Sequence, residues 1–462
     1  MSSLSTFFDS VIKDCGANCV QRSPEICSDY AMDRSSEEPV CPQAVLIPSS
    51  EADIQSMLKH ATALSIPITV RGAGSGKTGG AIPDTEGLVL SMENFDQIIE
   101  IDTETQTARV QANVLTKTLQ EAVIQKGLYY PPDPASADYC SIGGNVAENA
   151  GGPSCYKYGV TKDYILGMKG VYATGELFEF GGAIRKNVAG FDLISLLIGS
   201  EGTLAVITEI TCKLLPYPSY RETLFLNFQD YQGAVTFLSD IAKAGVFPKS
   251  AEFLEDRIIS ALEAYHSDVF PFSVSPAMIM MDCESYDETQ LQYECQTCED
   301  LAVQYNAKSQ RMKTTVEQDQ LWEYRRTISM ALTQMGGEKF SEDIVVPISQ
   351  LETCIKELND IATFHNVVII GYGHLGDGNI HVNCLKMDLS DSEWQAVKAK
   401  VIEKLLRLAV SLGGSITGEH GVGLSKKEHM NLMFTEKDLH IHRELKKVWD
   451  PSGILNPGKM IE

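Results

Sequence analysis

The sequence lacks a long apolar run and is short of positive charge. No stretch approaches the roughly 18 residues that a membrane span requires, and the opening "MSSLSTFFDSVIKDCG" has no basic segment leading into an apolar one. Among its 462 residues, 38 Lys and Arg stand against 62 Asp and Glu, a formal net charge of -24. Such an acidic surface argues against nucleic-acid binding and against basic attachment to anionic lipid. We therefore expect a cytoplasmic protein without a membrane span, and leave peripheral membrane association open.

The sequence also lacks a disulfide framework, an internal repeat and a low-complexity tract. Its 12 cysteines are scattered through a long chain, which is typical of reduced thiols in a cytosolic enzyme. Cys295 and Cys298 form the only CxxC pair. A lone pair is weak support for a zinc or iron–sulfur site, so we interpret it as structural. The length of the chain predicts two or three domains.

Two patterns divide the chain at a proline-containing segment, "LLPYPSY" at 214–220. Before it, from residue 42 to the glycines near residue 76, a strand, an amphipathic helix, a second strand and a glycine loop follow one another, which predicts a βαβ unit. After it, "ETLFLNF", "DYQGAVTFLSDIAKAG", "KSAEFLED" and "AMIMMDCES" alternate between strand and helix. This pattern predicts a separate α+β domain.

Three glycine-rich segments lie in the first part of the chain. "RGAGSGKTGG" at 71–80 resembles the end of a nucleotide-triphosphate P-loop, but Arg71 stands where that motif needs glycine, and the following "GGAIPD" cannot open a helix. The dinucleotide fingerprint GxGxxG is not matched convincingly either. The other two segments are "SIGGNVAENAGGPSCYKYG" and "GSEGTLAVITEITCKLLPYP". Backbone N–H groups in such loops form nests that bind a diphosphate.

The segment "GYGHLGDGNIHVN" at 371–383 predicts a β-hairpin, because a Gly/Asp/Asn turn separates two β-branched runs. With a turn over residues 376–379, His374 faces His381 with Cβ atoms roughly 5 Å apart. Asn383 shares that face. Two imidazoles so placed can hold a metal, and a polar hairpin with solvated rings is the alternative. This stretch alone does not decide between them.

Six motifs in order resemble those of the FAD-linked 2-hydroxy-acid dehydrogenases in the vanillyl-alcohol oxidase and p-cresol methylhydroxylase superfamily. They are the three glycine segments, "GHLGDGNIHVN", "TGEHGVG" and "WDPSGILNPGKM". The resemblance covers about residues 35–462 and is closest to the branch of glycolate oxidase, D-lactate dehydrogenase and D-2-hydroxyglutarate dehydrogenase. It implies an α+β fold: a two-subdomain FAD-binding domain of p-cresol methylhydroxylase type, and an α+β cap domain with a ferredoxin-like sheet. The implied parts are an extension (1–36), the FAD domain (37–217), the cap (218–430) and a returning segment (431–462).

The resemblance also implies which residues contact FAD. No histidine in the first loop offers a covalent attachment point, and Cys155 stands where related proteins often have an unlinked cysteine, so we expect dissociable FAD. Lys77 departs from the family pattern and either pairs with a phosphate or faces water. The implied FAD contacts are Arg71, Gly72, Gly74, Ser75, Gly76, Thr78, Gly79, Ser141, Gly143, Gly144, Asn145, Asn149, Gly151, Gly152, Glu201, Gly202, Val206 and Asn456.

The resemblance further implies a reaction centre. His374, His381 and Glu419 form a three-ligand set for a divalent metal, zinc or a comparable ion in similar enzymes, with open positions for substrate oxygens. His420 is the general base, and Asn383 orients the substrate. The remaining expected contacts are to the substrate's carboxylate: Arg325, Ser329 and, with a departure in its spacing, Lys339.

The expected activity is oxidation of a D-2-hydroxy acid, D-lactate or glycolate, to the 2-oxo acid. D-2-hydroxyglutarate is the alternative substrate, disfavoured because the departure at Lys339 weakens a distal carboxylate contact. A flavin protein that only relays electrons within an iron–sulfur complex is the alternative from another class. The electron acceptor is a quinone, a cytochrome or an electron-transfer flavoprotein, and an iron–sulfur subunit is a further candidate partner.

Overall fold

The computed structural model describes residues 3–85 and 87–461 and divides into two compact units. The first unit comprises the residues up to Gly151, Val160–Tyr217 and the residues from Glu419 on. The second unit comprises Gly152–Gly159 and Pro218–Gly418. The long middle segment of the second unit thus begins at Pro218, and the chain returns to the first unit at Glu419.

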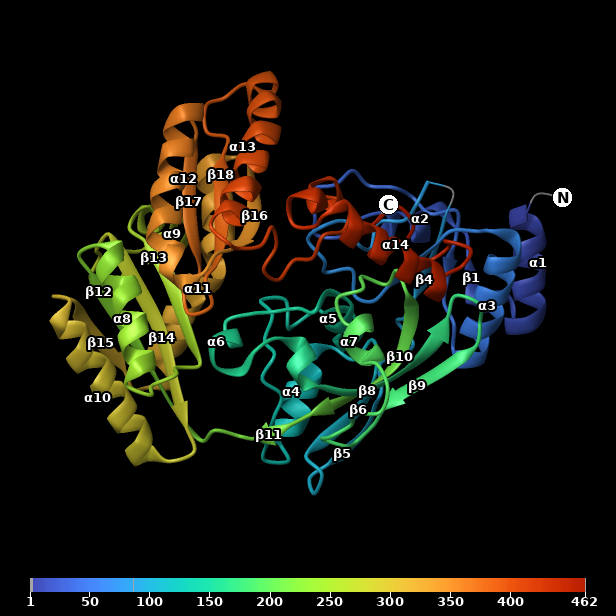
Figure 1. Cartoon of the computed structure of the whole chain (residues 1–462), viewed down its shortest axis with the longest axis horizontal. Helices are drawn as coiled ribbons and strands as arrows, with labels where there is room; N and C mark the ends of the chain where they lie inside the picture. Colours follow the sequence, from blue (N-terminus) through green and yellow to red (C-terminus); the bar gives the residue numbers. More distant parts are fainter. Residues whose placement is uncertain (1–2, 86, 462) are drawn as a thin grey trace. The chain divides into compact units, whose positions relative to one another are not determined.

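The first unit contains a four-stranded sheet, a five-stranded antiparallel sheet and a short two-stranded ribbon (Figure 1). Their strand orders are β1-β2-β4-β3, β5-β6-β10-β8-β9 and β11-β7. The strands are β1 (Val20–Gln21), β2 (Val45–Leu46), β3 (Ile68–Arg71), β4 (Leu88–Ser91), β5 (Ile98–Asp102), β6 (Thr107–Gln111), β7 (Leu128–Tyr129), β8 (Ile165–Tyr172), β9 (Leu177–Gly181), β10 (Ala205–Lys213) and β11 (Leu215–Pro216).

Helices of the first unit come from all three of its segments. The segment expected as an N-terminal extension contributes α1, which packs against α3. The helices are α1 (Ser3–Cys15), η1 (Ala17–Cys19), α2 (Pro24–Asp29), α3 (Glu51–Leu64), α4 (Thr116–Ile124), α5 (Ile142–Glu148), η2 (Thr161–Tyr164), α7 (Leu193–Leu197), η4 (Lys427–Leu432) and α14 (Glu436–Trp449).

The expected βαβ unit is confirmed, since β2 and β3 both run parallel to β4, which lies between them. Helix α3 crosses between β2 and β3 and begins at a capping box, in which Ser50 and Asp53 satisfy each other's backbone N–H groups. The described residues between β3 and β4 form no helix, which agrees with the argument against a P-loop.

The second unit is built on one seven-stranded antiparallel sheet of order β15-β12-β14-β13-β17-β18-β16. Its strands include those predicted from the sequence, together with β15 and β16, which were not predicted. They are β12 (Tyr220–Phe228), β13 (Ser250–Glu255), β14 (Ala277–Ser285), β15 (Lys308–Met312), β16 (Lys339–Val345), β17 (Val368–His374) and β18 (Asn379–Leu385).

Helices cover both faces of this sheet (Figure 1). Side chains of α9 and α11 form the core on one face with residues such as Phe225, Met280 and Ile370. On the opposite face, the ring of Phe237 in α8 packs on Phe228, and Trp394 in α13 packs on Phe340. The helices are α6 (Cys155–Tyr158), α8 (Tyr231–Lys243), α9 (Arg257–His266), α10 (Glu288–Gln304), α11 (Thr315–Gly336), η3 (Ile348–Gln350), α12 (Leu351–His365) and α13 (Asp391–Ser411).

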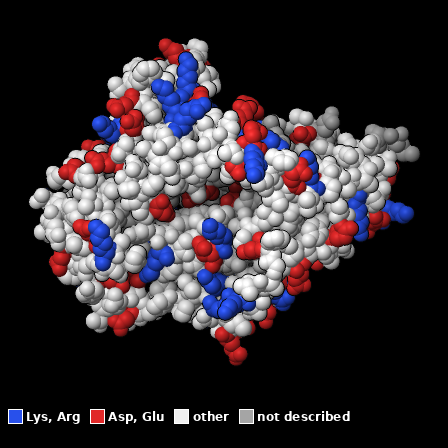
Figure 2. All heavy atoms as spheres, in the orientation of Figure 1, with Lys and Arg blue, Asp and Glu red and all other residues white. Residues whose placement is uncertain are grey.

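Three predictions from composition concern the cysteines, membrane-spanning helices and the charge of the surface. All 12 cysteines are free thiols, and Cys295 and Cys298 are buried on α10. None of the described helices is long and apolar enough to cross a membrane. On the face shown in Figure 2, Lys and Arg side chains lie interspersed with Asp and Glu, so this face offers no broad basic surface.

Candidate functional site

The glycine-rich segments of the first unit surround a cleft that encloses about 1360 Å³, including the part open to solvent. Expected FAD contacts that line it are Gly72, Gly74, Ser75, Gly76, Ser141, Gly143, Gly144, Asn145, Gly151, Glu201, Gly202 and Asn456. The cleft therefore gathers residues from all three segments and from the C-terminal "NPGK".

Six expected FAD contacts are not among the lining residues in the described part of the chain. Three of them have other functions: Arg71 donates to the carbonyl oxygens of Met32 and Ala81, Thr78 donates to that of His420, and Asn149 caps α5. The remaining three are Gly79, which packs near Leu424, Gly152, whose N–H donates to the Cys155 sulfur, and Val206, which is fully buried.

Val206 lies one residue out of phase with the cleft. Its neighbours Ala205 and Ile207 line the cleft, because successive residues of β10 point to opposite faces of the sheet. The motif identified the correct strand but not the side of it that faces the cavity.

Glycine is required at particular points of the cleft wall. A Cβ at Gly143 would lie 2.7 Å from the Ala112 carbonyl oxygen, so α5 could not approach β6 as closely with any other residue. Gly74 has φ +66°, and a Cβ there would lie 2.2 Å from the guanidinium of Arg71. The guanidinium of Arg71 thus packs against the first glycine loop and supports it.

Several residues that line the cleft were not predicted from the sequence. Pro134, Ala135, Ser136 and Tyr139 belong to the segment "PPDPASADY", and Glu148 ends α5. The proline-rich composition of that segment indicates a loop, but a loop without glycines carries no signature of a diphosphate site.

Lys77 also lines the cleft. Burial lowers the pKa of its ammonium, and the nearby Arg34 lowers it further.

The loop that carries Glu419 and His420 is fastened to the wall of this cleft. Both carboxylate oxygens of Glu201 accept backbone N–H groups, from Val422 and Gly423, at 2.7 Å each. These bonds explain why the chain rejoins the first unit at residue 419. Glu419 and His420 line the cleft, with 3.7 Å between a Glu419 carboxylate oxygen and Nε2 of His420.

Asn456 links the C-terminal segment to the same wall. Its side-chain oxygen accepts the Val70 N–H at 2.9 Å, and its amide nitrogen donates to the Glu201 carbonyl oxygen at 2.6 Å. Strand β3 and the "GSEG" segment are therefore joined by a residue almost 400 positions away from β3.

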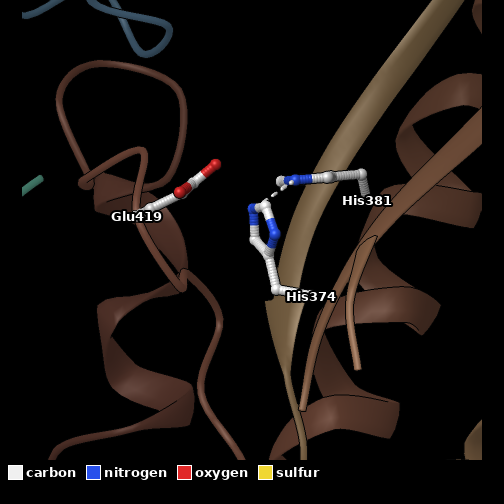
Figure 3. Close-up of side chains that lie close together, drawn as sticks. All are labelled: His374, His381 and Glu419. Carbon is white, nitrogen blue, oxygen red and sulfur yellow. Dashed lines mark hydrogen bonds between the residues drawn. The ribbon is translucent and has the colours of Figure 1, made fainter. Parts of the chain in front are cut away.

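The second unit contains the predicted histidine hairpin, formed by β17 and β18, but its register differs from the expectation. His374 pairs with Asn379, and Tyr372 pairs with His381, so the turn occupies Leu375–Gly378 rather than residues 376–379. The offset is two residues, and an even offset leaves each side chain on its original face. The two imidazoles are consequently diagonal neighbours, with Nε2 atoms 3.4 Å apart (Figure 3).

A buried acid on the neighbouring strand orients one of these rings. Nδ1 of His374 lies 2.7 Å from Glu252, its cross-strand partner on β13. Glu252 also binds Arg325 of α11 through Nε at 2.7 Å and Nη2 at 2.5 Å. Burial alone raises the pKa of Glu252, but His374 and Arg325 together hold it below its ordinary value. Glu252 thus remains a carboxylate, and Nε2 of His374 is the nitrogen directed toward His381.

Asp343 lies at the other side of the histidine pair. It is fully buried, and one of its oxygens is 3.8 Å from Nδ1 of His381. Its second oxygen accepts the backbone N–H of Gly418 at 2.8 Å. Gly418 is the last residue of the second unit, and Glu419 follows it directly.

The three residues of the expected metal set are of types that suit a divalent cation. Each offers one ligand atom, an imidazole nitrogen from His374 and His381 and a carboxylate oxygen from Glu419 (Figure 3). Zinc is commonly bound by nitrogen and oxygen ligands of this kind, and a carboxylate on the other ring nitrogen is the usual support for a metal-binding histidine. The donor types and the Glu252 contact therefore fit a catalytic metal.

The expected substrate contacts are differently placed within the second unit. Asn383 is fully buried, and its side-chain oxygen accepts hydrogen bonds from Lys339 at 2.7 Å and Ser341 at 2.6 Å. Ser329 is exposed on α11, one turn after Arg325. Arg325 is mostly buried, but a guanidinium has five N–H donors and Glu252 engages only part of them.

Comparisons with known proteins agree on the kind of protein. Residues 217–460 match the family described as FAD linked oxidases, C-terminal domain, and residues 42–181 match the FAD binding domain. The chain is 37% identical to glycolate oxidase subunit GlcD of Bacillus subtilis (93% of this chain, 91% of the relative). It is 34% identical to D-lactate dehydrogenase of Archaeoglobus fulgidus (90% and 91%), and 31% identical to D-2-hydroxyglutarate dehydrogenase of Stutzerimonas stutzeri (93% and 93%).

Solved structures share the fold at low identity. p-Cresol methylhydroxylase with substrate bound superposes with a TM-score of 0.83 at 14% identity, covering 100% of this chain and 97% of that one. 4-Ethylphenol oxidase from Gulosibacter chungangensis gives 0.78 at 18% identity, with coverage of 99% and 97%. The expected fold class, α+β of p-cresol methylhydroxylase type, is confirmed.

Proposed function

Because the chain belongs to the FAD-linked oxidases, we propose that it is an FAD-dependent, divalent-metal-assisted dehydrogenase that oxidises a D-2-hydroxy acid, D-lactate or glycolate, to the 2-oxo acid. Relatives named for glycolate, D-lactate and D-2-hydroxyglutarate support this substrate class. The observation that carries the proposal is the histidine pair of the second unit, with Nδ1 of His374 held by a buried carboxylate.

The cofactors supply two kinds of chemistry. FAD bound in the glycine-rich cleft would supply the acceptor for a hydride from the substrate's C2 carbon. His374, His381 and Glu419 would hold a divalent ion, with zinc as our choice, and its charge would lower the pKa of the substrate hydroxyl. The many glycines of the cleft wall support close approach of a bulky cofactor, because they present backbone without side chains.

The remaining tasks fall to side chains. His420 accepts the hydroxyl proton, because a neutral imidazole nitrogen can act as a general base toward an activated alcohol. Arg325 holds the substrate carboxylate with the N–H groups that Glu252 leaves over, and Ser329 assists from the next helical turn. Asn383 orients the substrate hydroxyl indirectly, through its hydrogen bond to the backbone carbonyl of His381.

The surroundings of Lys339 support a small monocarboxylate. Its ammonium donates to Ser341 and Asn383 at 2.7 Å each. A lysine held within the sheet in this way is not positioned to grip a second, distal carboxylate. D-2-hydroxyglutarate therefore remains the alternative substrate, although a relative bears that name.

The electron acceptor we propose is a quinone, a cytochrome or an electron-transfer flavoprotein. The glycolate oxidase relatives are named as subunits, which supports an iron–sulfur subunit as a further candidate partner. In the alternative, a relay protein would bind FAD without reacting with hydroxy acids. The base and ligand set described above favours a protein with its own chemistry.

We expect the purified protein to be yellow and its flavin to bleach anaerobically with D-lactate or glycolate but not with L-lactate. The flavin should be released by acid or heat as free FAD, because the first loop offers no histidine for a covalent bond. Absorption spectra before and after each acid provide the measurement. A colourless protein, flavin retained in the precipitate, or a spectrum unchanged by every acid would contradict the proposal.

We expect Arg325→Met to weaken substrate binding and slow flavin reduction, since a charge-assisted bidentate contact contributes roughly 1.5–3 kcal/mol, or about 10- to 150-fold. Arg326→Met is the matched control: Arg326 lies next on the same helix, is exposed and pairs with the surface residue Glu323. Stopped-flow reduction over a range of substrate concentrations separates binding from rate. Equal kinetics in the two variants would remove Arg325 from the substrate site.

A further inference from the structure

Glu148 is a partly buried acid that the proposed reaction leaves without a role. It is the last residue of α5 and lines the cleft of the first unit. Its Oε2 atom is covered by protein and has no hydrogen-bond partner among the described residues. An ionised oxygen is costly in such a place, so the carboxyl group is expected to carry a proton that it can offer to a ligand in the cleft.

The glycines around this carboxyl group fix its place. A Cβ at Gly80 in the first glycine loop would lie 3.3 Å from Oε1, and a Cβ at Gly421 in the loop after His420 would lie 2.2 Å from Oε2. The carboxyl group therefore lies between these two loops. Gly421, with φ +81°, favours glycine on conformational grounds as well, and the absence of a side chain there leaves space for the acid's oxygens.

Glu201 lies next to it. Oε1 of Glu201 is 3.0 Å from the same Cβ point at Gly421, so the two acids' oxygens are at most 5.2 Å apart (2.2 Å plus 3.0 Å). Two carboxylates this close in a buried site do not both ionise readily. Glu201 receives two backbone N–H bonds that stabilise its carboxylate, whereas the Oε2 of Glu148 receives none. The proton therefore belongs on Glu148.

Other charged groups nearby do not reverse this assignment. Burial raises the pKa of Glu148 well above its ordinary value, Glu201 and Asp33 raise it further, and only Lys459 lowers it. Burial brings the pKa of Lys459 itself down to about 7, and its ammonium donates to Gly80 and Thr69. Lys426, the other cation in the cluster, acts on Glu201.

We propose that Glu148 is a neutral carboxylic acid whose carboxyl group donates a hydrogen bond to an acceptor oxygen or nitrogen of FAD. The inference rests on the FAD site and not on the identity of the hydroxy acid. A protonated carboxyl group gives the cleft an uncharged hydrogen-bond donor that is stronger than an amide N–H. The second glycine segment then contributes an acidic side chain to cofactor binding as well as its backbone.

The test measures release of FAD from the diluted holoprotein by flavin fluorescence. Glu148→Gln keeps a neutral donor of the same shape and should hold FAD within about threefold of the parent. Glu148→Met has similar length but no donor and should bind FAD about tenfold more weakly, the usual effect of one lost hydrogen bond. Glu121→Gln, on the exposed side of α4, controls for loss of a negative charge.

A pH series adds a second readout. As the pH rises through the raised pKa of Glu148, the parent loses the donor proton and gains a negative charge, so FAD release should accelerate. In Glu148→Gln this component should be missing, because the amide does not ionise.

Three results would overturn the inference. Equal weakening in the Gln and Met variants would show that the carboxylate charge is needed, and full retention in the Met variant would show that Glu148 does not contact FAD. An alkaline release profile of Glu148→Gln identical to that of the parent would assign the ionisation to another group. Each result presupposes that the parent holds FAD; a parent without FAD would instead overturn the proposed function.

Discussion

The His420→Ala variant is expected to reduce its flavin about 10²- to 10⁴-fold more slowly than the parent, the usual contribution of a general base. It should nevertheless keep FAD, because the backbone carbonyl of His420, which accepts a hydrogen bond from Thr78 in the cleft wall, is unchanged in the variant. It should also keep its metal. Anaerobic stopped-flow reduction combined with elemental analysis makes the comparison.

The control for this variant is His440→Ala, an exposed histidine of α14 in the same unit. It should reduce flavin at the parent's rate. If His420→Ala loses metal while Glu419→Ala keeps it, the ligand and the base have been assigned the wrong way round. If His420→Ala reduces flavin as fast as the parent, another group accepts the proton.

The His381→Ala variant is expected to lose its divalent metal entirely while remaining yellow. Its side chain belongs to the sheet of the second unit, whereas the glycine-rich cleft is built from residues of the first. Glu252→Gln should have a milder effect, because supporting residues of this kind alter metal affinity by roughly 10- to 100-fold. Elemental analysis after dialysis against a graded series of chelator concentrations separates the two cases.

The difference in metal loss between His381→Ala and Glu252→Gln is the result that tests the metal site. If His381→Ala and Glu252→Gln both retain a full complement of metal, the hairpin is a structural feature. If Glu252→Gln loses metal as completely as His381→Ala, the acid does more than orient His374. Thermal unfolding of each variant checks that the loss of metal does not follow from loss of the fold, since Glu252 also binds Arg325.

Much of the fold was predictable because its signals are local. Strand β17, the turn and β18 are contiguous, so the hairpin was found from Gly, Asp and Asn between β-branched runs. The register was predicted two residues off because it depends on contacts beyond the hairpin. Gly378 has φ +80°, and a Cβ there would lie 2.0 Å from the Val346 carbonyl oxygen beyond the end of β16. This packing fixes where the turn ends, and no pattern within residues 371–383 contains it.

The candidate site was predictable where a local motif determines the backbone geometry, and not where the interacting residues are far apart in the sequence. The glycine loops identified most of the cleft wall, since glycine permits close approach wherever the backbone meets a ligand. Glu252 was missed because it reaches His374 only through pairing of strands 122 residues apart. Likewise, the family resemblance implied a FAD contact for Glu201, but it did not show that the Glu201 carboxylate accepts hydrogen bonds from Val422 and Gly423.

Asn456, which joins β3 to the "GSEG" segment, is synthesised long after both of them. Residues 218–418, which contain every strand of the second sheet, emerge before the segment that begins at Glu419. That sheet can therefore form early during synthesis, at the usual pace of about 5–20 residues per second, with only α6 supplied from upstream. The glycine loops emerge earlier but lack Asn456 and the Glu419–Gly423 segment until those residues are made. The cofactor cleft therefore stays incomplete while some 200 intervening residues are synthesised, so we expect FAD to bind only after that stretch.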